Sequence, residues 1–180
     1  EKLGCNTSIL ADLQGPKLRV GIIEEGTIVI PGDHVSFING EPFVGNKEKI
    51  YMNYDNFSKD VLPGEKILLD DGKLIFEVIS TDKDEKVEAK VIQGGKLKSK
   101  KGVNLPNTKI SLPALTPKDV VDAEFAIKQN VDWIALSFVR NSEDILDLKK
   151  LIEKHSDQKI PIIAKIEKPE GIDNIDKIIS

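Results

Sequence analysis

The apolar pattern of this 180-residue chain changes at Pro113, and the change limits which folds the chain can adopt. Before that point, residues 18–110 contain short apolar runs separated by Gly, Pro and Asn, a pattern typical of antiparallel strands. After it, apolar residues recur at helical spacing and alternate with two apolar strand segments, residues 133–139 and 160–166. Because strands that alternate with helices form parallel sheets, we expect two architectures within one chain.

The β-rich segment contains a clear hairpin over residues 66–76. Its Asp71-Gly72 pair suits a type I′ turn, in which both central residues need a positive φ. A further strand is expected over residues 86–93, and residues 54–61 resemble a short helix. Together these features predict a small antiparallel β domain, which we interpret as a barrel.

The segment after Pro113 carries clear signals for helix starts. Thr116, followed by Pro117 and by Asp119 three residues after the cap, predicts the start of a helix. A second helix is expected to be capped by Asn141 or Ser142, and residues 171–179 predict a third. Residues 8–12 predict another buried strand just before the β-rich segment, which therefore interrupts an α/β run.

Length and composition exclude several classes of protein. The chain holds 26 Lys and Arg against 30 Asp and Glu, and this acidic balance argues against binding of nucleic acid. No apolar run approaches the roughly 18 residues of a membrane span, and the single Cys5 excludes an internal disulfide, which fits a reducing compartment. The chain is too short for a complete (β/α)₈ barrel of about 250 residues, and it begins without an initiator Met or a signal sequence. We expect it to be part of a longer protein.

Two charged residues follow the apolar strand at residues 160–166. On a strand, Lys165 and Glu167 are two apart and share a face, at the carboxyl end where parallel barrels build active sites. A structural ion pair is an equally good interpretation, because a buried lysine and glutamate each need a partner. A lysine that forms a Schiff base is a third.

A second set of charges lies near the start of the chain. Asp12 ends a strand, and Lys17 and Arg19 lie two residues apart on one face. Two cations near one acid are suited to holding a phosphate, whereas an ordinary polar loop is the alternative interpretation. The basic run at residues 98–102 is likewise typical of a solvated face.

Three segments together resemble the signatures of the pyruvate kinase family: residues 10–21, residues 100–106 (Lys-Lys-Gly-Val-Asn-Leu-Pro) and residues 162–171. Residues 111–119 and 131–140 fit the same family in the same order, so the similarity covers nearly the whole chain. The resemblance implies an α/β plus all-β fold, an incomplete segment of a (β/α)₈ barrel interrupted by a small antiparallel β-barrel lid domain.

The implied domains are a barrel strand segment at residues 1–15, the lid at residues 16–112, and partial βα units of the barrel at residues 113–180. The implied activity is the glycolytic transfer of a phosphoryl group from phosphoenolpyruvate to ADP, giving pyruvate and ATP. The resemblance also implies Mg²⁺ or Mn²⁺ as cofactor and a cytoplasmic homotetramer that binds neither nucleic acid nor membrane. We expect the 180 residues alone to be inactive.

The resemblance assigns roles to individual residues. Lys165 matches the lysine that stabilises the phosphoryl group in transfer, and Glu167 matches a ligand of the divalent metal. Arg19 and Lys101 match residues that bind the nucleotide. Asp71 matches a lid acid that approaches the active site on closure, although the hairpin turn also explains an Asp-Gly pair.

Asp12 matches a residue of the family's monovalent-cation site, and here the sequence departs from the common pattern. Members that depend on K⁺ usually contain Asp-Thr-Lys-Gly-Pro-Glu, whereas this chain has Asp12-Leu13-Gln14-Gly15-Pro16-Lys17. An ammonium group at Lys17, paired with Asp12, would supply the charge that K⁺ brings. We therefore expect that K⁺ is not required.

Two other functions remain open on sequence grounds. The first is a Schiff-base enzyme of the aldolase type that uses Lys165 as nucleophile. The second is a non-catalytic role in which the β-rich segment is a binding module.

Overall fold

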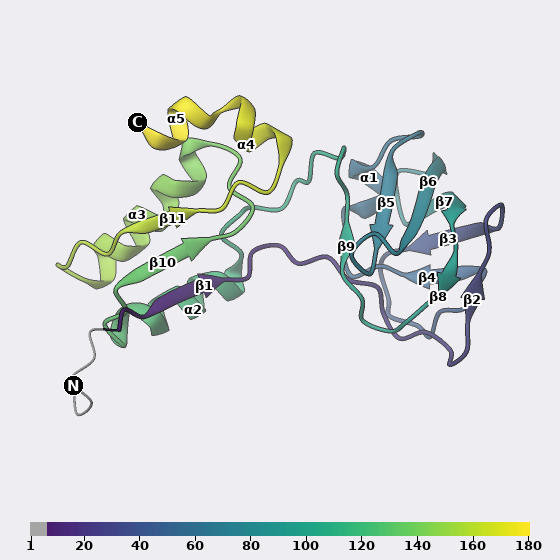
Figure 1. Cartoon of the computed structure of the whole chain (residues 1–180), viewed down its shortest axis with the longest axis horizontal. Helices are drawn as coiled ribbons and strands as arrows, with labels where there is room; N and C mark the ends of the chain where they lie inside the picture. The colour runs from purple at the N-terminus through teal and green to yellow at the C-terminus, as the bar shows by residue number, and fades with distance from the viewer. Residues whose placement is uncertain (1–6) are drawn as a thin grey trace. The chain divides into compact units, whose positions relative to one another are not determined.

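The computed structural model describes residues 7–180 and divides the chain into two compact units (Figure 1). One, which we call the α/β unit, combines residues 7–16 with residues 112–180, and the other, the β unit, comprises residues 17–111. The boundaries expected from the sequence, after residues 15 and 112, each lie one residue from these divisions. The β unit is thus an insertion within the α/β unit.

The α/β unit is built on a three-stranded parallel sheet in the order β1-β10-β11. These strands are β1 (Leu10–Leu13), β10 (Trp133–Leu136) and β11 (Ile162–Ala164). Leu136 of the central strand pairs with both Leu13 and Ala164, the last residues of its neighbours. All three strands therefore end together, and the residues that follow them lie at one edge of the sheet.

In the described part of the α/β unit, four helices accompany the sheet, two before β11 and two after it. They are α2 (Pro117–Lys128), α3 (Ser142–His155), α4 (Pro169–Asp173) and α5 (Ile175–Ile179). An apolar core joins β10 to the inner faces of α2 and α3 through buried apolar residues that include Ala123, Ile127, Ile134, Leu136, Leu148 and Ile152. No helix among the described residues is long and apolar enough to cross a membrane.

The predicted helix starts are confirmed. Thr116 is the cap of α2, and its hydroxyl accepts a hydrogen bond of 3.2 Å from the Asp119 N–H. The Asp119 carboxylate in turn accepts one of 3.0 Å from the Thr116 N–H, completing a capping box. Of the two alternatives for α3, Asn141 is the cap, since its side chain accepts from the Asp144 N–H at 3.0 Å.

Some predicted elements are shorter or divided. The expected third helix is wrong as one continuous element, because Asn174 separates α4 from α5. The Asn174 side chain donates hydrogen bonds to the carbonyls of Arg140 and Glu170, and such bonds compete with a regular helix. The strand expected at residues 133–139 ends at Leu136, because Phe138 has a φ of 57°.

The β unit contains a six-stranded sheet in the order β4-β3-β7-β6-β5-β9. In chain order these strands are β3 (His34–Ile38), β4 (Lys49–Tyr51), β5 (Lys66–Leu69), β6 (Leu74–Thr81), β7 (Lys86–Gln93) and β9 (Val103–Asn104). The unit also contains a two-stranded sheet of β2 (Ile28–Val29) with β8 (Gly95–Lys96), and the short helix α1 (Phe57–Asp60). The expectation of a purely antiparallel sheet is wrong at β3 and β4, which pair in parallel. Residues 39–48 return the chain to the other end of the sheet, so β4 runs in the direction of β3.

A short segment joins the two edges of the six-stranded sheet and closes it into a barrel. The Val20 N–H donates to the Lys101 carbonyl at 3.0 Å, just before β9, and the Gly21 N–H donates to the Tyr51 carbonyl of β4, also at 3.0 Å. The interior is filled by fully buried side chains, among them Phe37, Ile50, Met52, Phe57, Ile67 and Phe76. Closure removes the free edges that an open sheet would expose.

The β5–β6 hairpin turns as predicted. Asp71 and Gly72 have φ values of 59° and 82°, and the Lys73 N–H donates to the Asp70 carbonyl at 3.2 Å. A type I′ turn needs positive φ at both central residues, and the Asp71-Gly72 pair provides it.

Candidate functional site

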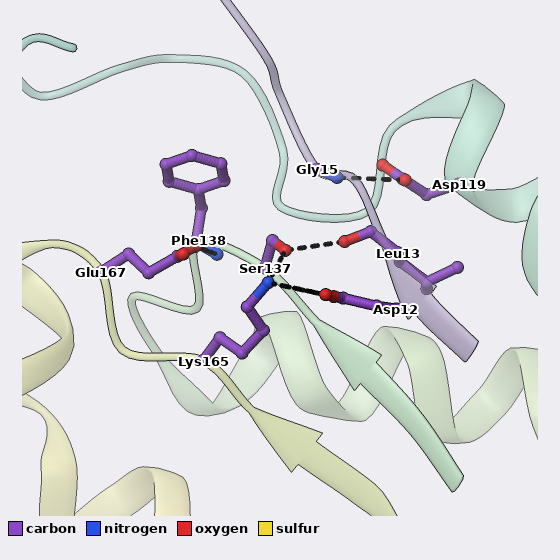
Figure 2. Close-up of polar contacts among 8 residues, drawn as sticks. All are labelled: Asp12, Leu13, Gly15, Asp119, Ser137, Phe138, Lys165 and Glu167. Atoms are coloured by element: carbon purple, nitrogen blue, oxygen red, sulfur yellow. Dashed lines mark hydrogen bonds and ion pairs between the residues drawn. The ribbon is translucent and has the colours of Figure 1, made fainter. Parts of the chain in front are cut away.

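The common edge at which β1, β10 and β11 end brings together the charged residues Asp12, Lys165 and Glu167 (Figure 2). Asp12 lies in β1, Ser137 and Phe138 follow β10, and Lys165 and Glu167 follow β11. In a parallel sheet this carboxyl edge is where ligands bind. The candidate site is therefore built from three segments that are far apart in the sequence.

Lys165 is held by residues from the other two strand ends of the sheet. Its Nζ lies 3.0 and 3.2 Å from the two carboxylate oxygens of Asp12 and 2.9 Å from the Oγ of Ser137 (Figure 2). The side chains of Lys165 and Asp12 are 33% and 58% exposed. The ammonium is thus oriented by the protein and still open to solvent, and water screens its attraction to Asp12.

Ser137 is a site residue that our sequence analysis missed. Its side chain is buried, and its hydroxyl donates a hydrogen bond of 2.7 Å to the Leu13 carbonyl. The same Oγ accepts from Lys165, so one hydroxyl links all three strand ends. A polar residue directly after the apolar strand of residues 133–136 was the signal available in the sequence.

Glu167 contacts the residue next to Ser137. Its Oε2 accepts a hydrogen bond of 3.0 Å from the backbone N–H of Phe138. Lys165 and Glu167 lie beyond the end of β11, so the predicted strand does not extend to them. The structure nevertheless brings both to one turn, because they contact the adjacent residues Ser137 and Phe138.

Gly15 and Asp119 fix the segment that leaves β1. Gly15 has a φ of 67°, a conformation that glycine adopts without a steric cost. Its N–H donates to Oδ1 of Asp119 at 3.1 Å, and Asp119 is fully buried at the start of α2. A buried carboxylate is tolerated because it accepts several hydrogen bonds.

The candidate residues of the β unit lie around one end of its barrel. Lys101 Nζ lies 3.0 Å from Oδ1 of Asp70, and an Nη of Arg19 donates to the Lys100 carbonyl at 3.0 Å. Arg19 pairs through its backbone with Gly102, whose carbonyl accepts from the Asp70 N–H at 3.1 Å. Arg19, Lys101 and the turn that follows β5 are thus neighbours.

The acid that pairs with Lys101 is Asp70, which directly precedes the expected lid acid Asp71. Asp70 is nearly buried, and Lys101 and then Lys73 hold the pKa of its carboxyl below the ordinary value, although partial burial opposes them. Asp71 occupies the exposed tip of the turn. Sequence reasoning missed Asp70 because two adjacent acids offered no signal to choose between them.

Lys17 and Asp12 belong to different units. Lys17 is exposed in the β unit, and the ion pair formed by Asp12 in the α/β unit is with Lys165. The pairing of Lys17 with Asp12 stays a prediction.

The acidic groups of the α/β unit fit one ligand of a divalent metal and not a complete set. Within residues 7–180 there is no group of three or more His, Cys, Asp or Glu that would hold a metal ion. Mg²⁺ is often bound by one or two carboxylates together with water and substrate phosphates. The exposed Glu167, oriented by the Phe138 N–H, suits such a shared site.

Comparison with known proteins places the whole chain in one family. Residues 1–180 match the family model described as the barrel domain of pyruvate kinase. The chain is 42% identical over 179 residues to the pyruvate kinase of Bacillus licheniformis, covering 99% of this chain and 31% of that protein. It is 42% identical over 180 residues to the pyruvate kinase of Geobacillus stearothermophilus, again with 31% of that protein covered. It is 39% identical over 179 residues to the pyruvate kinase of Corynebacterium glutamicum, with 37% covered. The chain spans about a third of the length of these relatives.

Proposed function

This chain belongs to the pyruvate kinase family, and from that premise we propose that it supplies part of the site at which a phosphoryl group passes from phosphoenolpyruvate to ADP. The products are pyruvate and ATP, as in glycolysis. One observation carries the proposal: the Lys165 ammonium is oriented at the common end of three parallel strands and stays open to a ligand.

Lys165 is suited to phosphoryl transfer because such reactions are accelerated mainly by positioning and by stabilising negative charge. Its ammonium is bound by a neutral hydroxyl and by the exposed carboxylate of Asp12. A phosphoryl group with greater negative charge can compete for the ammonium, since an exposed ion pair is worth about 1 kcal/mol or less. Lys165 would then stabilise the group as it moves.

Glu167 is the residue that would hold the divalent metal, Mg²⁺ or Mn²⁺, together with the substrate. When bound, the metal ion would neutralise charge on the phosphoryl oxygens. The chain's own contribution is to aim the carboxylate, which the Phe138 N–H does through its 3.0 Å hydrogen bond.

The β unit would bind the nucleotide phosphates through Arg19 and Lys101, with Asp71 contributing from the turn. Arginine matches phosphate by two parallel hydrogen bonds, and lysine acts as a point charge. Asp70 supports this assignment, because it restrains the Lys101 side chain by an ion pair of 3.0 Å. Closure of the β unit over the substrates would exclude water that competes for the phosphoryl group.

Further features of the whole protein follow from the same proposal. Lys17 would replace K⁺, so the enzyme would not require a monovalent cation. The protein would act in the cytoplasm as a homotetramer. Since the chain spans about a third of its relatives, we expect no ATP formation from these 180 residues alone.

The test is a steady-state assay of ATP formation by the full-length protein that contains this chain, with phosphoenolpyruvate, ADP and Mg²⁺. Lys165→Met should lower kcat by about a hundred- to a thousandfold, because it removes a charge aimed at the reacting group. Lys150→Met is the matched control, since Lys150 is 72% exposed on α3, outside the site.

Retention of full activity by Lys165→Met would overturn the proposal. Borohydride trapping of a carbonyl substrate on Lys165, detected by mass spectrometry, would instead indicate the Schiff-base chemistry of an aldolase.

A further inference from the structure

Of the two side chains that contact the Lys165 ammonium, Ser137 and Asp12, Ser137 is the more buried. Ser137 is 3% exposed, whereas the Asp12 side chain is 58% exposed. Water therefore screens and competes with the Asp12 contact more than with the part-buried 2.9 Å hydrogen bond between Lys165 and Ser137. Of the two restraints on the ammonium, the one from Ser137 is the more persistent.

The direction of each hydrogen bond at Ser137 is determined by its partners. The Leu13 carbonyl has no proton to donate, so the single hydroxyl proton of Ser137 points to it at 2.7 Å. The lone pairs of Oγ then face the ammonium of Lys165, which can only donate. A hydroxyl held in this way fixes the direction of the lysine side chain, which otherwise samples many rotamers.

The position of Ser137 is itself determined by its neighbours. The next residue, Phe138, has a left-handed backbone with a φ of 57°, which is rare for a bulky side chain. Gly15 packs directly against both Ser137 and Phe138. Contacts with the surrounding structure thus hold Phe138 in an unfavourable backbone conformation, as is found at functional sites.

We propose that Ser137 is a positioning residue that holds the Lys165 ammonium in the direction needed for phosphoryl transfer. Ser137 acts through Lys165 and does not touch the substrate. This inference rests on the proposed function, because it assumes that Lys165 acts on the phosphoryl group.

The test uses the full-length protein that contains this chain, with two substitutions at Ser137. Ser137→Ala removes the hydroxyl, and Ser137→Cys keeps a side chain of similar size with a much weaker donor and acceptor. Ser142→Ala is the matched control, because Ser142 lies at the start of α3, outside the site. Lys165→Met is measured in the same series.

Two readouts separate positioning from a structural role. In steady-state kinetics, Ser137→Ala and Ser137→Cys should both lower kcat by about ten- to a hundredfold, with the KM for ADP within about twofold of wild type. In the absence of substrates, pyridoxal 5′-phosphate followed by borohydride should label Lys165 several-fold faster in both variants, as measured by mass spectrometry of the labelled peptide. The midpoint of thermal unfolding is recorded for every variant.

The outcomes distinguish failure of the positioning role of Ser137 from failure of the proposed function. If Lys165→Met is inactive while Ser137→Ala and Ser137→Cys keep wild-type kcat and labelling rate, the positioning role is wrong and the proposed function stands. If Ser137→Cys restores kcat fully, packing and not the hydrogen bond is what matters, and the inference is again overturned. If Lys165→Met is active, the proposed function fails, and the role of Ser137 fails with it.

Discussion

Gly15 lies so close to Phe138 that a Cβ atom on Gly15 would sit 2.8 Å from the ring atom Cδ2 of Phe138. The same atom would lie 3.0 Å from the Cβ of Ser137. The turn after β10, which contacts both Lys165 and Glu167, therefore packs against the backbone of the segment that leaves β1. A glycine is needed there for two reasons, its φ of 67° and the lack of space.

Substitution of Gly15 by alanine should destabilise the α/β unit by about 2–5 kcal/mol, since the left-handed backbone and the clash both carry a cost. Trp133, the single tryptophan, lies in β10 and reports unfolding of this unit by fluorescence. Gly26→Ala is the control, because Gly26 has a φ of 81° and nothing within 4 Å of an added Cβ. Gly26→Ala should lower the free energy of unfolding of the β unit, followed by circular dichroism, by less than Gly15→Ala lowers that of the α/β unit. Equal losses would show that the close approach at Gly15 does not matter.

Removal of the Asp119 side chain should destabilise the α/β unit by about 2–4 kcal/mol. Asp119→Ala leaves the N–H groups of Gly15 and Thr116 without their acceptor inside the protein. Urea unfolding followed by Trp133 fluorescence measures the loss. Asp122→Ala on the same helix should cost less than about 1 kcal/mol, because Asp122 forms only an exposed ion pair with Lys118.

Asp70 should make the stability of the β unit depend on pH in the acid range. Its folded pKa is held below the ordinary 3.8, first by Lys101, so the stabilisation is present above pH 3.8 and is lost as pH falls through the lower folded value. The stability difference between wild type and Asp70→Asn should therefore shrink on acidification, as measured by urea unfolding at a series of pH values. In a Lys101→Met background the dependence on pH should be weaker, and an unchanged dependence would exclude Lys101 as its main cause.

Tyr54 should make the β unit sensitive to alkaline pH. Burial, followed by the hydrogen bond to Asp60, raises the pKa of Tyr54 to about 12. Because this folded pKa lies above the ordinary 10.0, the stabilisation is complete below pH 10 and is lost as pH rises toward 12. Tyr54→Phe should be less stable than wild type at pH 8, and the difference should decline above pH 10. A constant difference up to pH 12 would contradict the assignment.

The full-length protein that contains this chain should change its activity less than about twofold when K⁺ replaces tetramethylammonium at constant ionic strength. The physical reason is the ammonium group of Lys17, which would supply the charge of the ion near Asp12. Lys17→Glu should introduce a dependence on K⁺. A many-fold activation of the wild type by K⁺ would show that Lys17 does not replace the ion.

The sequence by itself determined the features of this protein that depend on neighbouring residues. The capping box of Thr116 and Asp119 and the turn at Asp71 and Gly72 are local, because their hydrogen bonds and φ values are set within four residues. The alternation of strands and helices, which is also a local pattern, predicted the α/β unit and its interruption by the β unit. The distinctive segments, such as residues 100–106, were sufficient to predict the family.

Only the tertiary structure decided which side chains meet. Ser137 contacts Lys165 because the register of three parallel strands brings together residues that are 28 positions apart. Asp70 pairs with Lys101 because the antiparallel register of β5 with β9 brings the two residues together, and the parallel pairing of β3 with β4 depends on the path of a long loop. Such contacts depend on how distant segments pack, and one chain carries no local signal for them. The sequence therefore indicated most of the elements and the charged residues that lie at the strand ends, and packing decided the geometry of the site.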